Sequence, residues 1–257
     1  MKIAIIGMGV VGRAQARMFS GHELRSYDPA DDDYPYPYDA VKACDFAVIA
    51  AGTPPLASGA ADLSGLRTAM DRLHPAMPVL IRSTVPPGTT GALAGTRDGI
   101  TAHAPDFMYE SKSGPWQESA DVPWMLLGGR NRDRDFFRDR LAAVFPGVIH
   151  ECSALTAELA KYTANLYWAA RVTFVNEMAG ICSAFGADWE VVRKAWLADE
   201  RVGPAYTGMK GFGPGFGGRC WPKDLSALIT ASAGAGYGAE FLRDIEAANE
   251  RFREYET

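Results

Sequence analysis

A glycine-rich segment near the C-terminal end carries a single cysteine between basic residues. Residues 211–224 read Gly-Phe-Gly-Pro-Gly-Phe-Gly-Gly-Arg-Cys-Trp-Pro-Lys-Asp. Glycine loses more backbone entropy on ordering than any other residue, so five glycines before a cysteine are typical of a loop whose backbone lies close to a ligand. Arg219, Lys223 and a helix starting near Asp224 favour the thiolate form of Cys220, which is its nucleophilic form.

The other three cysteines predict no chemistry of their own. Cys44, Cys152 and Cys182 are widely spaced, and no C-x-x-C pair is present. We expect each to be a small buried apolar residue, and we expect neither a disulfide framework nor a metal site. This cysteine usage is typical of a reducing, cytoplasmic location.

Lys161 and Asn165 are a second candidate pair, four residues apart in a segment with helical spacing of apolar residues. Residues 153–185 contain no proline and one glycine, which predicts one long helix ending at Gly186. Residues at i and i+4 share one helix face. Such a pair is usually solvated, but its apolar neighbours also allow a cleft position.

The N-terminal segment predicts a dinucleotide site. A short apolar strand, Lys2 to Ile6, is followed by Gly-Met-Gly-Val-Val-Gly, residues 7–12, and then by a helix. In this context Gly7 makes the tight turn, Gly9 lets the pyrophosphate approach the backbone, and Gly12 lets the helix pack on the strand. The helix N-terminus, at Val10 and Val11, offers N–H groups to the phosphates.

Asp28 ends a second strand, about 20 residues beyond the glycines, where a carboxylate binds the ribose hydroxyls. Asp31, Asp32 and Asp33 follow it, and their charges would repel a 2′-phosphate. We therefore expect NAD rather than NADP. A glycine turn that binds no nucleotide is the weaker interpretation.

Strands and helices alternate as far as His150, which predicts a mostly parallel sheet covered by helices on both faces. Thr53 and Pro54 follow one strand and Thr84 follows the next, at the edge where such sheets bind ligands. Thr84 taken alone is better explained as a turn or capping residue. We predict an α/β, Rossmann-type NAD domain over residues 1–152 and an all-helical domain with one long central helix over residues 153–257.

The formal net charge of −5 argues against a nucleic-acid or membrane-surface partner, and no apolar run reaches 18 residues. An anionic or nucleotide-linked small molecule remains a possible substrate. The long apolar helix is hard to bury in a helical domain of about a hundred residues. We therefore expect a homodimer formed through this helix.

The segment Gly-Phe-Gly-Gly-Arg-Cys-Trp-Pro-Lys-Asp resembles the active-site segment of the UDP-glucose/GDP-mannose dehydrogenase family. Further segments resemble the family in the same order. They are residues 7–12, Gly52-Thr53-Pro54, Ser83-Thr84-Val85-Pro86, Glu158-Leu-Ala-Lys161-Tyr-Thr-Ala-Asn165 and Asn176-Glu177. The resemblance implies oxidation of a primary alcohol to a carboxylate with two NAD, through a thiohemiacetal and a thioester on the cysteine.

The resemblance also implies roles for single residues. The catalytic set would be Cys220 as nucleophile, Lys161 at the oxyanion, Asn165 on the substrate, Asp224 as base or water activator, and Thr84 and Glu110 positioning water and the nicotinamide. The cofactor would contact Gly7, Gly9, Val10, Val11, Gly12, Asp28, Thr53, Pro54, Thr84, Glu110 and Lys223. The substrate would contact Asp106, Phe107, Met108, Tyr109, Lys161, Asn165, Arg201, Tyr206 and Gly217, with Arg201 reaching across a dimer.

The sequence departs from the family pattern at two of these positions. Asp106 stands where the family has glutamate, and Tyr109 stands where it has arginine. Family members also continue into a second α/β domain, so we expect the resemblance to cover only the first two domains. The substrate would then be a UDP-glucose-like nucleotide sugar, or a smaller nucleotide, nucleoside or sugar phosphate.

Two other functions remain open. A two-electron dehydrogenase of the β-hydroxyacid type would use a Rossmann domain, a long helix and a Lys-x-x-x-Asn pair, but not Cys220. A non-catalytic NAD-binding partner protein would need none of the catalytic residues. The number of NADH formed per substrate distinguishes these functions.

Overall fold

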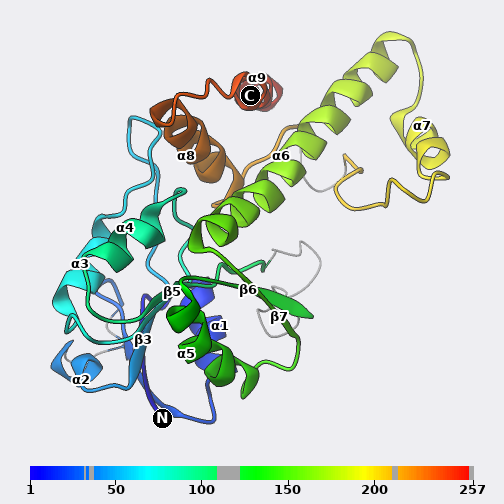
Figure 1. Cartoon of the computed structure of the whole chain (residues 1–257). Helices are drawn as coiled ribbons and strands as arrows, with labels where there is room; N and C mark the ends of the chain where they lie inside the picture. The colour runs from blue at the N-terminus through cyan, green and yellow to red at the C-terminus, as the bar shows by residue number, and fades with distance from the viewer. Residues whose placement is uncertain (32, 35–37, 109–121, 210–213, 255–257) are drawn as a thin grey trace. The chain divides into compact units, whose positions relative to one another are not determined.

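The computed structural model describes residues 1–31, 33–34, 38–108, 122–209 and 214–254. The chain divides into two compact units (Figure 1). Unit 1 contains residues 1–56 and 61–161, and unit 2 contains residues 57–60 and 162–257. Among the described residues, no helix is both long enough and apolar enough to cross a membrane.

Unit 1 is built on one sheet of seven strands in the order β2-β1-β3-β4-β5-β6-β7. The strands are β1 (Lys2–Ile6), β2 (Glu23–Tyr27), β3 (Phe46–Ile49), β4 (Val79–Ile81), β5 (Thr101–His103), β6 (Trp124–Gly128) and β7 (Val148–Cys152). Every neighbouring pair is parallel except β5 and β6. The predicted mostly parallel α/β fold is therefore confirmed.

Helices cover both faces of this sheet because adjacent strand residues point to opposite sides. The helices of unit 1 are α1 (Val10–Met18), α2 (Tyr38–Lys42), α3 (Ser64–Arg72), α4 (Thr89–Gly95) and α5 (Asn131–Ala142). Side chains of α2, α3 and α4 pack on one face, with Ala4, Ile6 and Ile49 of the strands. Side chains of α1 and α5 pack on the other, with Ile3 and Val48.

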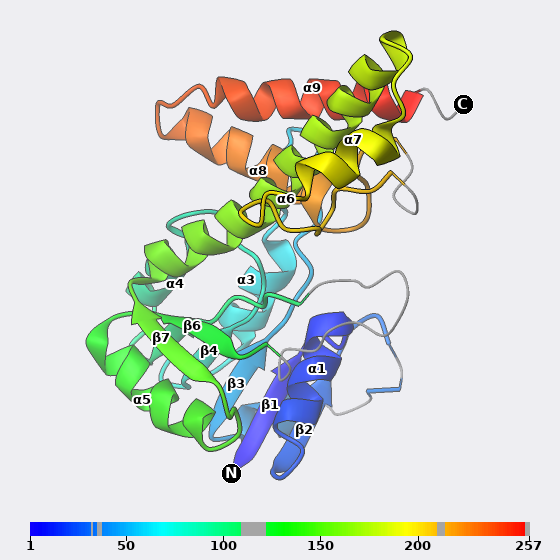
Figure 2. The same cartoon turned by 90° about the vertical axis from the view of Figure 1, so that its right-hand side faces the viewer.

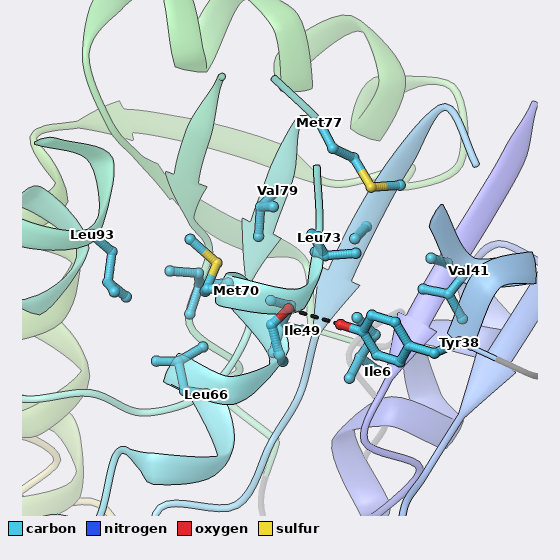
Figure 3. Close-up of a cluster of buried hydrophobic side chains, with 14 of the residues drawn as sticks. Ile6, Tyr38, Val41, Ile49, Leu66, Met70, Leu73, Met77, Val79 and Leu93 are labelled. Atoms are coloured by element: carbon cyan, nitrogen blue, oxygen red, sulfur yellow. Dashed lines mark hydrogen bonds between the residues drawn. The ribbon is translucent and has the colours of Figure 1, made fainter. Parts of the chain in front are cut away.

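Figure 3 shows the first of these packed faces. Leu66 and Met70 of α3 pack against the strand residues Ile6, Ile49 and Val79, and all five side chains are buried. The Tyr38 hydroxyl donates a hydrogen bond of 2.8 Å to the Ala69 carbonyl, so the one polar atom of α2 in this cluster is paired. The sequence interpretation did not include α2 or α4.

Unit 2 is all-helical, and most of the long helix α6 (Ala154–Ala184) belongs to it (Figure 2). Its other helices are α7 (Trp189–Trp196), α8 (Trp221–Gly234) and α9 (Glu240–Glu254). Leu166 of α6, Leu225 and Ile229 of α8 and Ile245 of α9 share one core with Phe216. The predicted long helix is confirmed, and Gly186 follows it with a φ of +71°.

The two units divide inside α6, between Lys161 and Tyr162. The first turns of α6 belong to unit 1. They are joined to it by the Glu158 carboxylate, which accepts hydrogen bonds of 2.6 and 2.7 Å from the amides of Gly88 and Thr90 at the start of α4. The domain boundary at residue 152 that we expect from sequence remains a prediction.

Candidate active site

The glycine turn after β1 has the backbone geometry that the sequence predicts. Gly7 has a φ of +88°, and a Cβ on it would lie 2.7 Å from the Ala50 carbonyl oxygen. A Cβ on Gly12 would lie 1.9 Å from the Gly7 carbonyl oxygen, so only glycine lets α1 pack this closely on the turn. Gly9 is the N-cap of α1, and a Cβ there would meet no atom within 4 Å.

Asp28 lies at the end of β2 beside this turn. Its carboxylate accepts hydrogen bonds from the amides of Met8 at 2.7 Å and Ala30 at 2.9 Å. The side chain is half-buried, and a carboxylate has about four lone-pair sites, so it can still accept from ribose hydroxyls. An open helix N-terminus at Val10 and Val11 beside a fixed carboxylate fits a dinucleotide.

The loops after β3 and β4 are tied to each other by hydroxyl groups. Thr53 donates to the Thr84 carbonyl at 2.9 Å, and Ser83 donates to the Ala51 carbonyl at 2.7 Å. Thr53 is buried and Pro54 is exposed beside it. The Thr84 hydroxyl is half-buried and bonds to nothing in the part of the chain that the structure describes, so it can contact a ligand.

Asp106 lies in a buried ion pair. Its carboxylate accepts from Arg82 Nη2 at 2.7 Å, from Gln15 Nε2 at 3.2 Å and from the Met108 amide at 3.0 Å. The Arg82 and Asp106 side chains are 2% and 4% exposed. This carboxylate therefore ties α1, the end of β4 and the segment after β5 together.

Phe107 and Lys161 meet within unit 1. The Lys161 ammonium lies 5.2 Å from the centre of the Phe107 ring, and Phe107 also packs against Trp124 at 4.6 Å. A small cavity beside them is lined by Arg82, Asp106, Phe107 and Trp124. Tyr109 and Glu110, both predicted site residues, lie outside the described residues.

In unit 2, Asn165, Lys223 and Asp224 come together. Asn165 Nδ2 donates to one Asp224 carboxylate oxygen at 2.6 Å, and Lys223 Nζ donates to the other at 2.5 Å. Asp224 is 1% exposed, and Lys161 and Asn165 are 8% exposed, so the Lys-x-x-x-Asn pair is not a solvated one. The helix begins at Trp221, so it starts before Asp224, and Asp224 belongs to its first turn.

Cys220 is the N-cap of α8 and is exposed. A thiolate there faces the positive end of the helix dipole. The remaining cysteines differ, because Cys182 is buried and burial raises the pKa values of the half-buried Cys44 and Cys152 thiols. The predicted burial is therefore confirmed for Cys182 and was wrong for Cys44 and Cys152, which are half-buried.

The other predicted substrate residues of unit 2 are also placed. Tyr206 is half-buried, has a φ of +57° and packs against Trp168 and Trp221. Arg201 is 90% exposed and forms a two-point ion pair with Asp199. Gly217 is exposed beside the Arg253 guanidinium.

Sequence reasoning missed several residues that hold this site. Arg82, Gln15 and Asn249 have buried polar bonds but were given no role. The available signal was a polar residue at an apolar position: Arg82 directly follows a buried strand, and Asn249 lies four residues after the buried Ile245 on α9.

The chain thus combines a Rossmann-type unit and an all-helical unit that divide within one long helix. Residues 155–251 match the family model of the UDP-glucose/GDP-mannose dehydrogenase family, central domain. The matched residues include the cysteine segment, so this comparison agrees with the family resemblance of that segment.

Named relatives agree with this assignment. The chain is 34% identical over 225 residues to the UDP-glucose 6-dehydrogenase of Pseudomonas aeruginosa, in a match that covers 80% of this chain and 48% of the relative. The structure of a UDP-glucose dehydrogenase from Pyrobaculum islandicum has a TM-score of 0.81 and 26% identity, covering 97% of this chain and 68% of that one. The chain spans about half the length of the first of these relatives.

A third similarity shows the fold alone. The 3-hydroxyisobutyrate dehydrogenase of Mycobacterium tuberculosis has a TM-score of 0.70 at 20% identity, and the match covers 98% of this chain and 93% of that one. The two-unit fold is therefore shared by enzymes with different substrates. The function has to be argued from the site.

Proposed function

We propose that this chain carries the catalytic core of an NAD-dependent dehydrogenase that oxidises the primary alcohol of a nucleotide sugar to a carboxylate. The enzymes of its family are NAD-dependent dehydrogenases acting on CH–OH groups. One observation carries the proposal: of the four cysteines, all within the described residues, Cys220 alone is exposed, and it occupies the N-cap position of a helix whose first turn holds Lys223 and Asp224. A two-electron dehydrogenase has no use for such a thiol.

Unit 1 would hold the cofactor and unit 2 the nucleophile. Gly7, Gly9 and Gly12 keep the turn open to a pyrophosphate, and Asp28 presents a carboxylate to the ribose. When bound, NAD supplies a hydride acceptor for each of the two oxidations. Glu110, Lys223, Pro54 and Thr84 remain proposed contacts of the same cofactor.

The cysteine would work on the aldehyde formed in the first oxidation. The Cys220 thiolate adds to the aldehyde carbon, and the resulting oxyanion is stabilised by the Lys161 ammonium. The second oxidation converts this thiohemiacetal to a thioester, and one water then releases the carboxylate and regenerates the thiol. Overall, one alcohol, two NAD and one water give one carboxylate, two NADH and three protons.

Asp224 would orient the groups around this step. Its carboxylate already accepts from Asn165 and Lys223, which leaves lone pairs for a water or a substrate hydroxyl. The predicted substrate contacts of Asp106, Phe107, Met108, Tyr109, Arg201, Tyr206 and Gly217 remain part of the proposal. UDP-glucose is the first substrate to test, followed by other nucleotide sugars, nucleotides, nucleosides and sugar phosphates.

The test compares Cys220→Ala with wild type and with Cys152→Ala, a change at a half-buried cysteine. We expect two NADH per carboxylate in wild type and in Cys152→Ala. Loss of the nucleophile should slow carboxylate formation by roughly 10³-fold or more. One NADH per substrate with an unaffected Cys220→Ala variant would favour the β-hydroxyacid type. NAD binding without turnover on any substrate would favour a non-catalytic partner.

We also propose a homodimer formed through α6. Tyr167, Phe174 and Ile181 recur every seven residues on this helix and are 55%, 52% and 42% exposed. Residues with this spacing form one stripe along a helix, and a second copy would bury it. Phe174→Asp should give a monomer by sedimentation. Phe241→Asp changes a phenylalanine of α9 that is 69% exposed, and it should leave the dimer intact. A wild-type monomer at micromolar concentration would contradict this.

The four free cysteines support a reducing, cytoplasmic location. Localisation of a tagged full-length protein by cell fractionation tests this proposal directly.

A further inference from the structure

Two asparagine side chains bind the backbone of Gly215 and Phe216, directly before the exposed residues 217–220 that end at Cys220. Asn176 Oδ1 accepts a hydrogen bond of 3.0 Å from the Gly215 amide. Asn249 Oδ1 accepts one of 2.6 Å from the Phe216 amide, and Asn249 Nδ2 donates one of 3.0 Å to the Phe216 carbonyl. Asn176 comes from α6 and Asn249 from α9, so the two helices hold adjacent peptide groups.

Asn249 binds the Phe216 backbone at both of its polar groups, as a neighbouring strand would. Asn176 and Asn249 are 5% and 7% exposed, so water does not compete for these bonds. Gly215 has a φ of +77°, and a Cβ on it would lie 2.7 Å from Asn249 Oδ1. Glycine at this position is therefore what lets the asparagine approach the backbone.

The Phe216 side chain is held as firmly as its backbone. It is 2% exposed and packs with Leu166, Leu225 and Ile245. Its ring lies 6.2 Å from that of Trp221, the first residue of α8. Residues 217–220 are exposed between these two fixed points, so the place of the Cys220 thiol depends on where Phe216 is held.

We propose that Asn249, assisted by Asn176, is a positioning residue for Cys220. The bonds that these asparagines make to the loop go to its backbone. They fix the peptide four residues before Cys220, and α8 fixes the peptide directly after it. The inference rests on the proposed role of Cys220 as the nucleophile, but the position of the loop can be measured without turnover.

The variant Asn249→Leu keeps the size of the side chain and removes all of its hydrogen bonds. We expect hydrogen exchange of the peptide containing residues 214–220 to accelerate roughly tenfold. The pH profile and rate of Cys220 alkylation by iodoacetamide, read by peptide mass spectrometry, should shift. For turnover we expect kcat to fall roughly 10²-fold, since small misplacements of a reacting group have effects of this size. NAD affinity should stay within about twofold, because the glycine turn lies in unit 1.

Two variants of α9 serve as controls. Ile245→Val loosens the same buried face without touching the loop backbone, and Glu250→Ala changes an exposed neighbour of Asn249. Glu250→Ala should leave the alkylation profile unchanged. Ile245→Val loosens the packing of Phe216 but keeps its backbone bonds to Asn249, so it should shift the profile far less than Asn249→Leu, even where it lowers the melting temperature as much. If Asn249→Leu does not fold, Asn176→Ala removes one of the same backbone bonds and should give the same shifts at smaller amplitude.

The outcomes separate this inference from the proposed function. An alkylation profile and exchange rate in Asn249→Leu equal to those of Ile245→Val would overturn the positioning role. An unchanged kcat in a variant whose loop has loosened would overturn it as well. Altered exchange and alkylation in a protein that oxidises no alcohol would uphold the positioning of the thiol and reject the dehydrogenase.

Discussion

The two glycine-rich segments of this chain are fixed in different ways. The turn at residues 7–12 is fixed by contacts of its own backbone, such as the close approach of Gly12 to the Gly7 carbonyl. The loop before Cys220 is fixed by asparagine side chains that lie 39 and 33 residues away in sequence. A site built on local sterics can be recognised from a short motif, whereas one built on distant side chains cannot.

The sharpest test of this contrast is an alanine at Gly12. The added Cβ would lie 1.9 Å from a backbone oxygen, so α1 must move away from the turn. We expect Gly12→Ala to lower the free energy of unfolding by more than about 4 kcal/mol and to abolish NAD binding. Urea unfolding and calorimetric titration with NAD measure both effects.

Gly9→Ala is the matched control, because its Cβ has no neighbour within 4 Å. Gly9→Ala should fold with nearly wild-type stability. It should nevertheless bind NAD more weakly, because the added Cβ keeps the pyrophosphate from approaching the backbone of the turn. Equal stabilities of the two variants would show that local sterics do not fix the turn.

The Arg82–Asp106 ion pair tests how far side chains also hold unit 1. Arg82→Met leaves the buried Asp106 carboxylate without its cation, which should cost about 3–5 kcal/mol. The double variant Arg82→Met/Asp106→Asn should recover much of this loss, because no charge remains buried. Urea unfolding of the single and double variants measures the free energy of coupling between Arg82 and Asp106. A double variant no more stable than Arg82→Met would contradict a stabilising role of this ion pair.

His103 should make unit 1 sensitive to acid in a way that unit 2 is not. All four histidines lie in residues 1–152, and burial lowers the pKa of His103 from 6.5 to about 4. A depressed pKa stabilises the folded state above pH 6.5, and that stability is lost as pH falls through 4. The loss is about 3 kcal/mol.

In His103→Gln the free energy of unfolding should therefore depend less steeply on pH between 6.5 and 4. His150→Gln, an exposed control, should keep the wild-type slope. Burial raises the pKa of Glu158, which acts in the opposite sense and is common to all three proteins. Equal slopes for His103→Gln and wild type would remove this difference between the units.

The smallest expected effect concerns the cysteine loop. Gly218 has a φ of +80°, but a Cβ on it would meet no atom within 4 Å. Gly218→Ala should therefore cost only roughly 1–2 kcal/mol, the price of a left-handed conformation for an L-residue. Thermal unfolding measures the change, and a loss as large as that of Gly12→Ala would show that the two segments are fixed alike.

Most of the fold could be predicted from local patterns in the sequence. The strand–turn–helix start, the strands up to residue 152 and the long helix follow from period and composition, and the structure confirms them. Asp188 caps α7 by accepting a hydrogen bond of 2.8 Å from the Glu190 amide, which is the usual role of aspartate directly before a helix. Helix α2, with five residues, is too short for a periodic pattern.

The candidate site was only partly predictable. Cys220, Lys161 and Asn165 stand out because their types and neighbours suggest chemistry. The bonds that hold them depend on residues far apart in sequence, such as Gln15 with Asp106, which are 91 positions apart. A local pattern cannot predict which buried polar groups bond to each other. The roles of Arg82 and Asn249 could therefore be recognised only from the structure.

The most direct test of the central proposal is a search for substrate covalently bound to Cys220. Wild-type protein is mixed with UDP-glucose and NAD, quenched in acid within the first turnover and digested for mass spectrometry. We expect the mass of the oxidised substrate on the peptide that contains Cys220, and no such adduct in Cys220→Ala. Carboxylate formed at the wild-type rate by Cys220→Ala, with no adduct in either protein, would contradict covalent catalysis by this cysteine.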